Sequence, residues 1–535
     1  MQFVNQDTVK ISNHQRSFRE SLLAMMGLFF VVMMVALDQT VVGTALPTIV
    51  ADLKGFDLYA WVATSYLLTS VITVPIFGRL GDFFGRKYFV VASIIIFTLA
   101  SALCGLASSM SFLVIARSLQ GIGGGMLVGT AFACVPDLFP DPHARLQWQI
   151  IISTAFGLAN AIGPSLGGFL TQYYGWRSVF YVNLPIGILS LWFVWRHMPH
   201  IRNSYHRGSM SLDWIGALLI ALVLGSLQLF VEFVLRQGTH LVSTVFALVC
   251  IGAIIGLLYH ERRAKQPVLP LEMFRERALS ALFMLSVCIG FILFAWMFYL
   301  PLMLQGGFGL SPNAAGLIIT PLVVCITVGS IASGRLITRI PSISIIMNTG
   351  IVLLIAAGVG MTVLEPDRGH VLTLTYMIVG GLGIGLVMPN LTIFTQELAG
   401  RSHLGIATAL IQSFRMVGGM IGTALVGSVV NRFYTSSVSD YLDLHHASAL
   451  RTSLTDPQIL VNPVAKEALK AHAQIYHVDG ALLIDMARQS LIHSVHVSLI
   501  LPVGAAIGAL WLMRRVPPMK LSGNIRHVPL PVDET

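Results

Sequence analysis

Two charged residues lie within apolar segments of the sequence, where a charge is costly to keep. Asp38 is about sixteen residues into the first segment, and Arg117 is about six residues into the fourth. A charge at the centre of a bilayer costs at least about 2.5–3.5 kcal/mol unless it is neutralised, paired or exposed to water. A carboxylate in such a place can take up and release a proton as its surroundings change, so Asp38 is a candidate proton acceptor.

Arg117 stays protonated and would therefore tune a carboxylate or hold water, but would not carry the proton itself. The first and fourth segments run in opposite directions, which places both residues in the outer half of the membrane, where they could meet or compete for one water. Each residue also has a structural alternative. Asp38 could be a hydrogen-bonding group satisfied by Thr40 or by a neighbouring helix, and Arg117 could cap helix carbonyls.

Two further ionisable residues are candidates for substrate or proton binding. Arg415 lies with Gln412 in the middle of the thirteenth segment, where a pocket or coupling role competes with a purely structural pairing. Glu232 is near the outer end of the seventh segment, where a carboxylate can reach the membrane surface, which favours a structural role.

A strongly charged decapeptide, residues 78–87, joins the second and third apolar segments. Its composition predicts a tight loop at the membrane surface, in which glycines let two helix ends approach and one carboxylate exchanges ionic hydrogen bonds with its basic neighbours. Such a cluster would act as a gate; the alternative is a topology signal with glycines for the turn. The gate residues are Gly78, Arg79, Asp82, Gly85, Arg86 and Lys87.

The composition determines the class of protein that carries these residues. The chain has 535 residues, of which 55% are hydrophobic and 11% charged, so too little polar surface exists to cover a soluble fold. We therefore expect an all-α, multi-pass membrane protein. The net charge of +9 falls in short clusters between apolar runs, which sets topology and argues against nucleic-acid binding. No metal or cofactor motif is present and the five cysteines have no paired spacing, so we expect neither a cofactor nor an enzyme activity.

Fourteen apolar segments are long enough to span a bilayer. Glycine patterns repeat between the first six and the last six: residues 78–80 match 334–336, and residues 121–125 match 381–385. The chain is therefore predicted to form two related six-helix repeats with a two-helix insert, an arrangement that places a substrate path between the repeats. The predicted spans are 22–50, 58–78, 88–107, 111–135, 147–170, 178–197, 213–235, 241–260, 278–304, 313–335, 343–364, 371–395, 404–431 and 489–513.

The distribution of basic residues predicts the topology. Placing both termini in the cytoplasm puts most of the 33 Lys and Arg residues on the cytoplasmic side. Residues 432–488 then form the one sizeable external loop, and the pattern around Pro463 to Ala487 permits short amphipathic helices. The predicted units are an N-terminal six-helix bundle at 1–198, a cytoplasmic linker with two inserted helices at 199–270, a C-terminal six-helix bundle at 271–513 and a cytoplasmic tail at 514–535.

Several motifs resemble those of a known family. The decapeptide resembles the loop between helices 2 and 3 of the major facilitator superfamily, where acidic and basic residues are thought to gate the cytoplasmic side. Residues 38–47 and 175–187 resemble the opening motif and the start of the sixth span in its fourteen-span drug/proton antiporters, the EmrB/QacA-like group. The fifth span carries a similar antiporter motif: Gly157, Gly163, Pro164, Gly167 and Gly168. The sequence departs from the pattern at Gly43, where Asn is more usual, and at 335–341, which contain no acidic residue.

The resemblance implies the major facilitator fold and proton-coupled export of amphipathic or cationic toxic compounds across the plasma membrane, which is the inner membrane in bacteria. Under this interpretation Asp38 accepts the proton, Arg117 adjusts the proton affinity of Asp38, and residues 163–168 form a flexing helix. The implied partners are small-molecule substrates, protons, the lipid bilayer and, in a double-membraned cell, a periplasmic adaptor protein. Two alternatives stay open: a proton-coupled transporter of one defined metabolite, and a non-transporting membrane sensor.

Overall fold

The structure is a computed structural model that describes residues 18–138, 142–198, 213–234, 239–264, 271–337, 342–365, 370–399, 404–444, 450–475 and 479–517. Throughout these ranges the backbone forms helices and short turns, without strands. The first group of elements is α1 (Phe18–Leu53), η1 (Phe56–Leu58), α2 (Tyr59–Phe84), α3 (Arg86–Gly105), α4 (Met110–Leu138), α5 (Pro142–Tyr174), α6 (Ser178–Tyr181) and α7 (Asn183–His197).

Two helices, α8 (Trp214–Val234) and α9 (His240–Glu261), separate this group from the second. The second group is η2 (Leu271–Phe274), α10 (Arg277–Leu302), the π-helical turn η3 (Met303–Gly307), α11 (Pro312–Leu336), α12 (Ile343–Met361), α13 (His370–Ala399), α14 (Leu404–Leu444), α15 (Arg451–Leu454), η7 (Pro457–Leu460), α16 (Pro463–Ile475) and α17 (Gly480–Met513).

Most of these helices can cross a membrane. In the described part of the chain, 12 helices are long and apolar enough to do so, with α6 and α7 together forming one of them. Helices α2 and α5 are a further 26 and 33 residues long. The chain is therefore a multi-pass membrane protein, and every span predicted from the sequence overlaps a helix of the structure.

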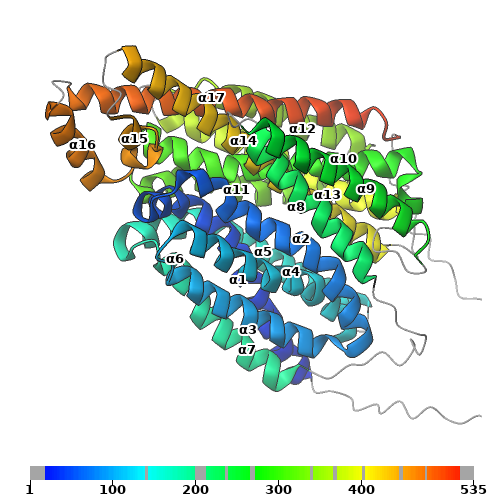
Figure 1. Ribbon diagram of the computed structural model, residues 1–535. Helices are drawn as coiled ribbons and strands as arrows, with labels where there is room; N and C mark the ends of the chain where they lie inside the picture. Colours follow the sequence, from blue (N-terminus) through cyan, green and yellow to red (C-terminus); the bar gives the residue numbers. More distant parts are fainter. Residues whose placement is uncertain are drawn as a thin grey trace, which may run out of the picture.

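The helices form two bundles that lie side by side (Figure 1). Helices α1 to α7 make the first bundle, and α10 to α14 with α17 make the second. The bundles meet along α5 with α11 and along α2 with α14, while α8 packs against α2 and α14 and carries α9 on its other side. Helices α15 and α16 lie at one end of the molecule, and α1 begins and α17 ends at the opposite end (Figure 1).

The repeated glycines have the same role in both bundles. A Cβ atom on Gly121 would overlap the carbonyl oxygen of Tyr66, and a Cβ atom on Gly381 would overlap that of Leu322. Glycine therefore lets α4 approach the backbone of α2, and it lets α13 approach α11 in the same way. This matching packing agrees with the internal repeat predicted from the sequence.

The prediction that residues 78–87 form a loop is wrong. Helix α2 continues to Phe84, and Gly85 alone separates it from α3, which begins at Arg86. Gly85 has φ 92°, a left-handed value that glycine adopts without strain. The earlier glycines of the decapeptide do not break the helix because packing against α4 holds α2 in place.

The two helices that flank the predicted external segment 432–488 are longer than their predicted spans. Helix α14 continues to Leu444 and α17 begins at Gly480, so both extend beyond their predicted spans. Tyr434 and Leu442 of α14 and Leu483 of α17 are buried in the core, which explains why the helical turns continue. Between these helices lie α15, η7 and α16, and α16 is an amphipathic helix of the kind expected there.

Candidate functional site

Asp38 and Arg117 meet inside the first bundle. Arg117 Nη1 lies 2.6 Å from Asp38 Oδ2, and the side chains of Arg117 and Asp38 are 2% and 0% exposed. Asp38 comes from α1 and Arg117 from α4, two helices that pack against each other. The two residues therefore form a buried ion pair that is closed to water and lipid in this state.

Two amide side chains complete the surroundings of Asp38. Gln120 Nε2 donates to Asp38 Oδ1 at 2.7 Å, and Asn183 Nδ2 donates to the same oxygen at 3.1 Å. Asn183 Nδ2 also lies 3.0 Å from Ser101 Oγ. Both carboxylate oxygens thus act only as hydrogen-bond acceptors, as the oxygens of a deprotonated acid must. The cluster joins α1, α3, α4 and α7 at one point.

Arg117 makes two further contacts besides those with Asp38 and Gln120. Its Nε donates to the Val62 carbonyl oxygen at 3.2 Å, and its guanidinium carbon lies 4.5 Å from the centre of the Tyr66 ring. The carbonyl contact matches the structural alternative considered for Arg117, but it occurs together with the ion pair. Thr40 does not satisfy Asp38, because its hydroxyl donates to the backbone of α1 instead.

Sequence reasoning did not single out Gln120 or Asn183 as members of this site. A signal was present for Gln120, since a polar residue three positions after Arg117 lies on the same helix face. Asn183 stood within a motif that resembles the start of the sixth span, but nothing in its spacing connected it to Asp38. Only the packing of α7 against α1 brings it there.

The predicted gate residues lie at the junction of α2 and α3. Gly85 forms the break, and Arg86 and Lys87 are partly buried in the first turn of α3. Gly78, Arg79 and Asp82 belong to the last turns of α2, but their side-chain surroundings lie outside the described residues.

The motif of α5 lies between the two bundles. A Cβ atom on Gly163 would overlap Thr40 of α1, and one on Gly168 would overlap the backbone of Pro312 in α11. Glycine is thus required on both faces of α5, where the helix touches its own bundle and the other one. The other residues of the motif, on the same helix, are Gly157, Pro164 and Gly167.

Hydrogen bonds also join the bundles close to the α1–α2 turn. The Tyr59 hydroxyl donates to the Phe298 carbonyl oxygen at 2.6 Å, and Gln305 Nε2 donates to the Thr44 carbonyl oxygen at 2.7 Å. A Cβ atom on Gly43 would lie 2.9 Å from the carbonyl oxygen of Met297. The glycine that departs from the family pattern therefore allows α1 and α10 to touch.

Arg415 lies in α14, in different surroundings from Arg117. Its Nη2 donates to Gln412 Oε1, one turn earlier on the same helix. Among the described residues no carboxylate lies within ion-pair distance of its guanidinium. The structural pairing considered for Arg415 is thus a contact with a neutral amide.

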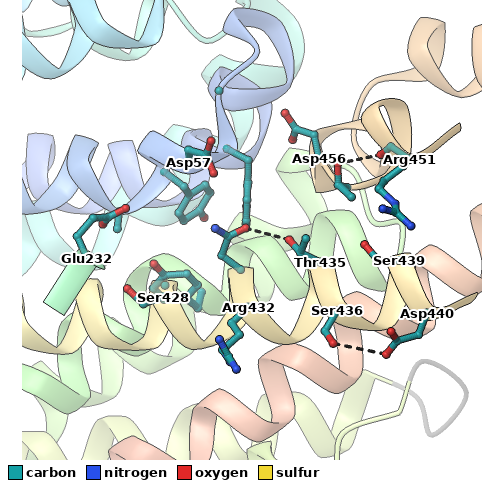
Figure 2. Close-up of a pocket in the computed structure, with 18 of the residues that line it drawn as sticks. Asp57, Glu232, Ser428, Arg432, Thr435, Ser436, Ser439, Asp440, Arg451 and Asp456 are labelled. Carbon is teal, nitrogen blue, oxygen red and sulfur yellow. Dashed lines mark hydrogen bonds between the residues drawn. The ribbon is translucent and has the colours of Figure 1, made fainter. Parts of the chain in front are cut away.

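Glu232 lines a pocket of about 750 Å³ at the end of the molecule where α15 lies (Figure 2). The walls come from η1 and α2, from α8, and from α10, α14 and α15. Figure 2 shows Glu232 and Asp57 on one side of the pocket, with Asp456 and Arg451 on another. The charged residues of the lining are Asp57, Glu232, Arg432, Asp440, Asp443, Arg451 and Asp456.

Comparison with known proteins shows extensive similarity to membrane transporters. The Major Facilitator Superfamily signature matches residues 28–423. The chain is 33% identical to "Multidrug transporter protein MdtP" of Bacillus subtilis (strain 168), over 96% of each chain. It is 30% identical to "Multidrug resistance protein 3" of the same organism, over 91% of this chain and 94% of the other.

The fold is similar to solved transporter structures. A bacterial homologue of the human lysosomal transporter Spinster, solved in an inward-facing and unoccupied conformation, superimposes with a TM-score of 0.66 at 15% identity. The superposition covers 94% of this chain and 98% of the other.

Proposed function

The chain belongs to the major facilitator superfamily and is a transporter, not an enzyme, and we propose that it exports amphipathic toxic compounds in exchange for protons. The names of the relatives support a multidrug substrate range. The observation that supports the proton coupling is the buried pair of Asp38 and Arg117, whose direct hydrogen bonds join α1, α4 and α7.

The proposed proton step takes place at the Asp38 carboxylate. A proton from the outside adds to one carboxylate oxygen, Asp38 becomes neutral, and the ionic bond to Arg117 is lost. The Oδ1 atom of Asn183 is buried without a hydrogen-bond partner among the described residues, so a rotated amide can accept the new O–H. Release of the proton to the cytoplasm restores the ion pair. Each cycle therefore changes the contacts among α1, α4 and α7.

One proton is enough to drive a useful gradient. A charge that crosses about 100 mV releases about 2.3 kcal/mol, and each tenfold gradient of a neutral substrate requires about 1.4 kcal/mol. A single proton can thus sustain roughly a fiftyfold substrate gradient for each 100 mV.

We assign the chain to the fourteen-span drug/proton antiporters of the superfamily. Adding α2 and α5 to the 12 apolar helices gives this number, and α1 beginning and α17 ending at one end of the molecule fit two cytoplasmic termini. The proposed units remain the bundles 1–198 and 271–513, the insert 199–270 and the tail 514–535. The proposed location is the plasma membrane, the inner membrane of a bacterium.

We assign the gate to the junction of α2 and α3 and the hinge to α5. The last turns of α2, with Arg79 and Asp82, and the start of α3, with Arg86 and Lys87, would latch the cytoplasmic side. Helix α5 would move against α11, supported by the glycine contact at Gly168. Glu232 is proposed as a carboxylate of the outer pocket, where protons and released substrate reach the external medium.

Efflux from energised cells tests this function. Cells that express the wild type or Asp38→Asn are loaded with a fluorescent lipophilic compound, with and without a protonophore, and membrane levels are matched by immunoblotting. Proton-driven export predicts fast efflux only in energised wild-type cells. Equal, slow leakage in every condition would exclude multidrug export and direct the search to single metabolites.

A further inference from the structure

Arg415 is a cation of α14 that forms no ion pair with any residue that the structure describes. The sequence contains no Asp or Glu between Glu276 and Glu365, or between residues 404 and 439. In α13 the acidic residue is Glu397, close to the end of the helix, and in α17 it is Asp485, close to the start. The central turns of these helices therefore contain no carboxylate.

Arg415 does not face the lipid on an outer helix. Every residue of α14 from Leu410 to Asn431 is buried or partly buried, so the helix runs between its neighbours. A Cβ atom on Gly290 of α10 would overlap the Arg415 carbonyl oxygen, and Ser286 Oγ donates to the Ile411 carbonyl oxygen at 2.7 Å. The backbone that carries Arg415 is therefore fixed against α10, while its partly buried side chain extends from an inner helix.

The polar atoms gathered at this point include several donors. Gln412 Oε1 accepts from Arg415, which leaves the Nε2 hydrogens of Gln412 and the remaining guanidinium hydrogens to donate. A guanidinium with an adjacent amide matches the oxygens of a planar or tetrahedral anion. A cation would meet a positive charge here, without a carboxylate in the described surroundings to offset it.

We propose that Arg415 and Gln412 bind the anionic group of a transported amphipathic compound, such as a carboxylate, sulfonate or phosphate. This inference rests on the proposed function, because it names a substrate class for that transport path. The first bundle then takes the proton at Asp38, and the second recognises the charge of the substrate at Arg415.

Two xanthene dyes of opposite charge test the proposal: fluorescein, an anion, and rhodamine 6G, a cation. Binding to the purified full-length protein is measured in a neutral detergent free of anionic lipid. Wild-type protein should bind fluorescein, and Arg415→Gln should lower the ratio of fluorescein to rhodamine affinity by about tenfold to a hundredfold, because a charge-assisted hydrogen bond is lost. Arg415→Lys should keep part of the preference, and Gln412→Ala should lower it by a few fold.

Folding of each variant is checked by size-exclusion elution and thermal unfolding. An unchanged affinity ratio in folded Arg415→Gln would overturn the proposal. Should that variant not fold, the wild type still decides, since binding of rhodamine 6G without fluorescein would also overturn it.

Transport in proteoliposomes separates this inference from the proposed function and from lipid binding. Export of rhodamine 6G but not of fluorescein would leave multidrug transport standing and remove the anion site. If neither dye is transported, both the proposed multidrug transport and the anion site are excluded. An anionic lipid headgroup offers the same chemistry, so fluorescein binding is repeated with phosphatidylglycerol present. Full competition by the lipid, combined with absence of fluorescein transport, would assign Arg415 to lipid and overturn the proposal.

Discussion

Each bundle contains an arginine within a membrane-spanning helix, and the surroundings of the two arginines differ. Arg117 is enclosed with a carboxylate at 2.6 Å and is 2% exposed, whereas Arg415 contacts a neutral amide and is only partly buried. The bundles share their glycine packing, so this difference lies in the side chains and not in the helical framework. The buried pair of Asp38 and Arg117 can change its charge by one proton, while the guanidinium of Arg415 keeps hydrogen-bond donors for an anion. The comparison therefore suggests that coupling and recognition are divided between the repeats.

The largest expected effect concerns the closed pair. Asp38→Asn should lower the free energy of unfolding by about 3–5 kcal/mol, because it leaves the Arg117 charge buried without its partner. Denaturant titration of the purified protein measures this loss. The double variant Asp38→Asn with Arg117→Met should recover much of it, since no buried charge remains. If the double variant is no more stable than the single one, the two residues do not act as a pair.

The next effect concerns the contact between the bundles. Gly168→Ala should destabilise the protein by about 1–3 kcal/mol, because the new methyl group overlaps the Pro312 backbone and forces α5 and α11 apart. Gly504→Ala on α17 is the matched control, since its Cβ atom would have no neighbour within 4 Å. Thermal unfolding and cross-linking between α5 and α11 report the change. Equal behaviour of the two variants would contradict the role assigned to the glycine.

A third prediction compares a glycine at a helix break, Gly85, with a glycine inside a helix, Gly334. Gly85→Ala should destabilise the protein by about 1–3 kcal/mol, because alanine is strained at φ 92°. Gly334→Ala in α11 should instead stabilise it by about 0.5–1 kcal/mol, since the site is helical and its Cβ atom would be free of neighbours within 4 Å. Denaturant titration of both variants should show changes of opposite sign; the same sign in both would contradict the backbone conformations assigned to the two glycines.

The smallest expected effect concerns the open cation. Arg415→Met should change the free energy of unfolding by less than about 1 kcal/mol, because no carboxylate is left unpaired when the guanidinium is removed. The same titration measures this value beside that of Asp38→Asn. A loss as large as that of Asp38→Asn would mean that Arg415 has a hidden partner, and the contrast between the bundles would disappear.

The sequence predicted the helical class and a helix at each span, and a contact between Asp38 and Arg117 was one of the two arrangements it left open. These features follow from hydropathy, helix direction and the cost of a charge in the membrane. It missed the continuation of α2 to Phe84, because charge and glycine indicated a loop while packing against α4 kept the helix intact. It also missed Asn183 beside Asp38, since tertiary packing alone brings α7 to α1.

The measurement that tests the proton site most directly is infrared difference spectroscopy of the purified protein as the pH is lowered. A protonated carboxylic acid has a carbonyl stretch that a carboxylate lacks, and Asp38→Asn removes this group alone. We predict an acid band that grows in the wild type over the pH range in which transport occurs, and that is missing from Asp38→Asn. An identical band in both proteins, or no band in the wild type over that range, would contradict the assignment of Asp38 as the proton acceptor.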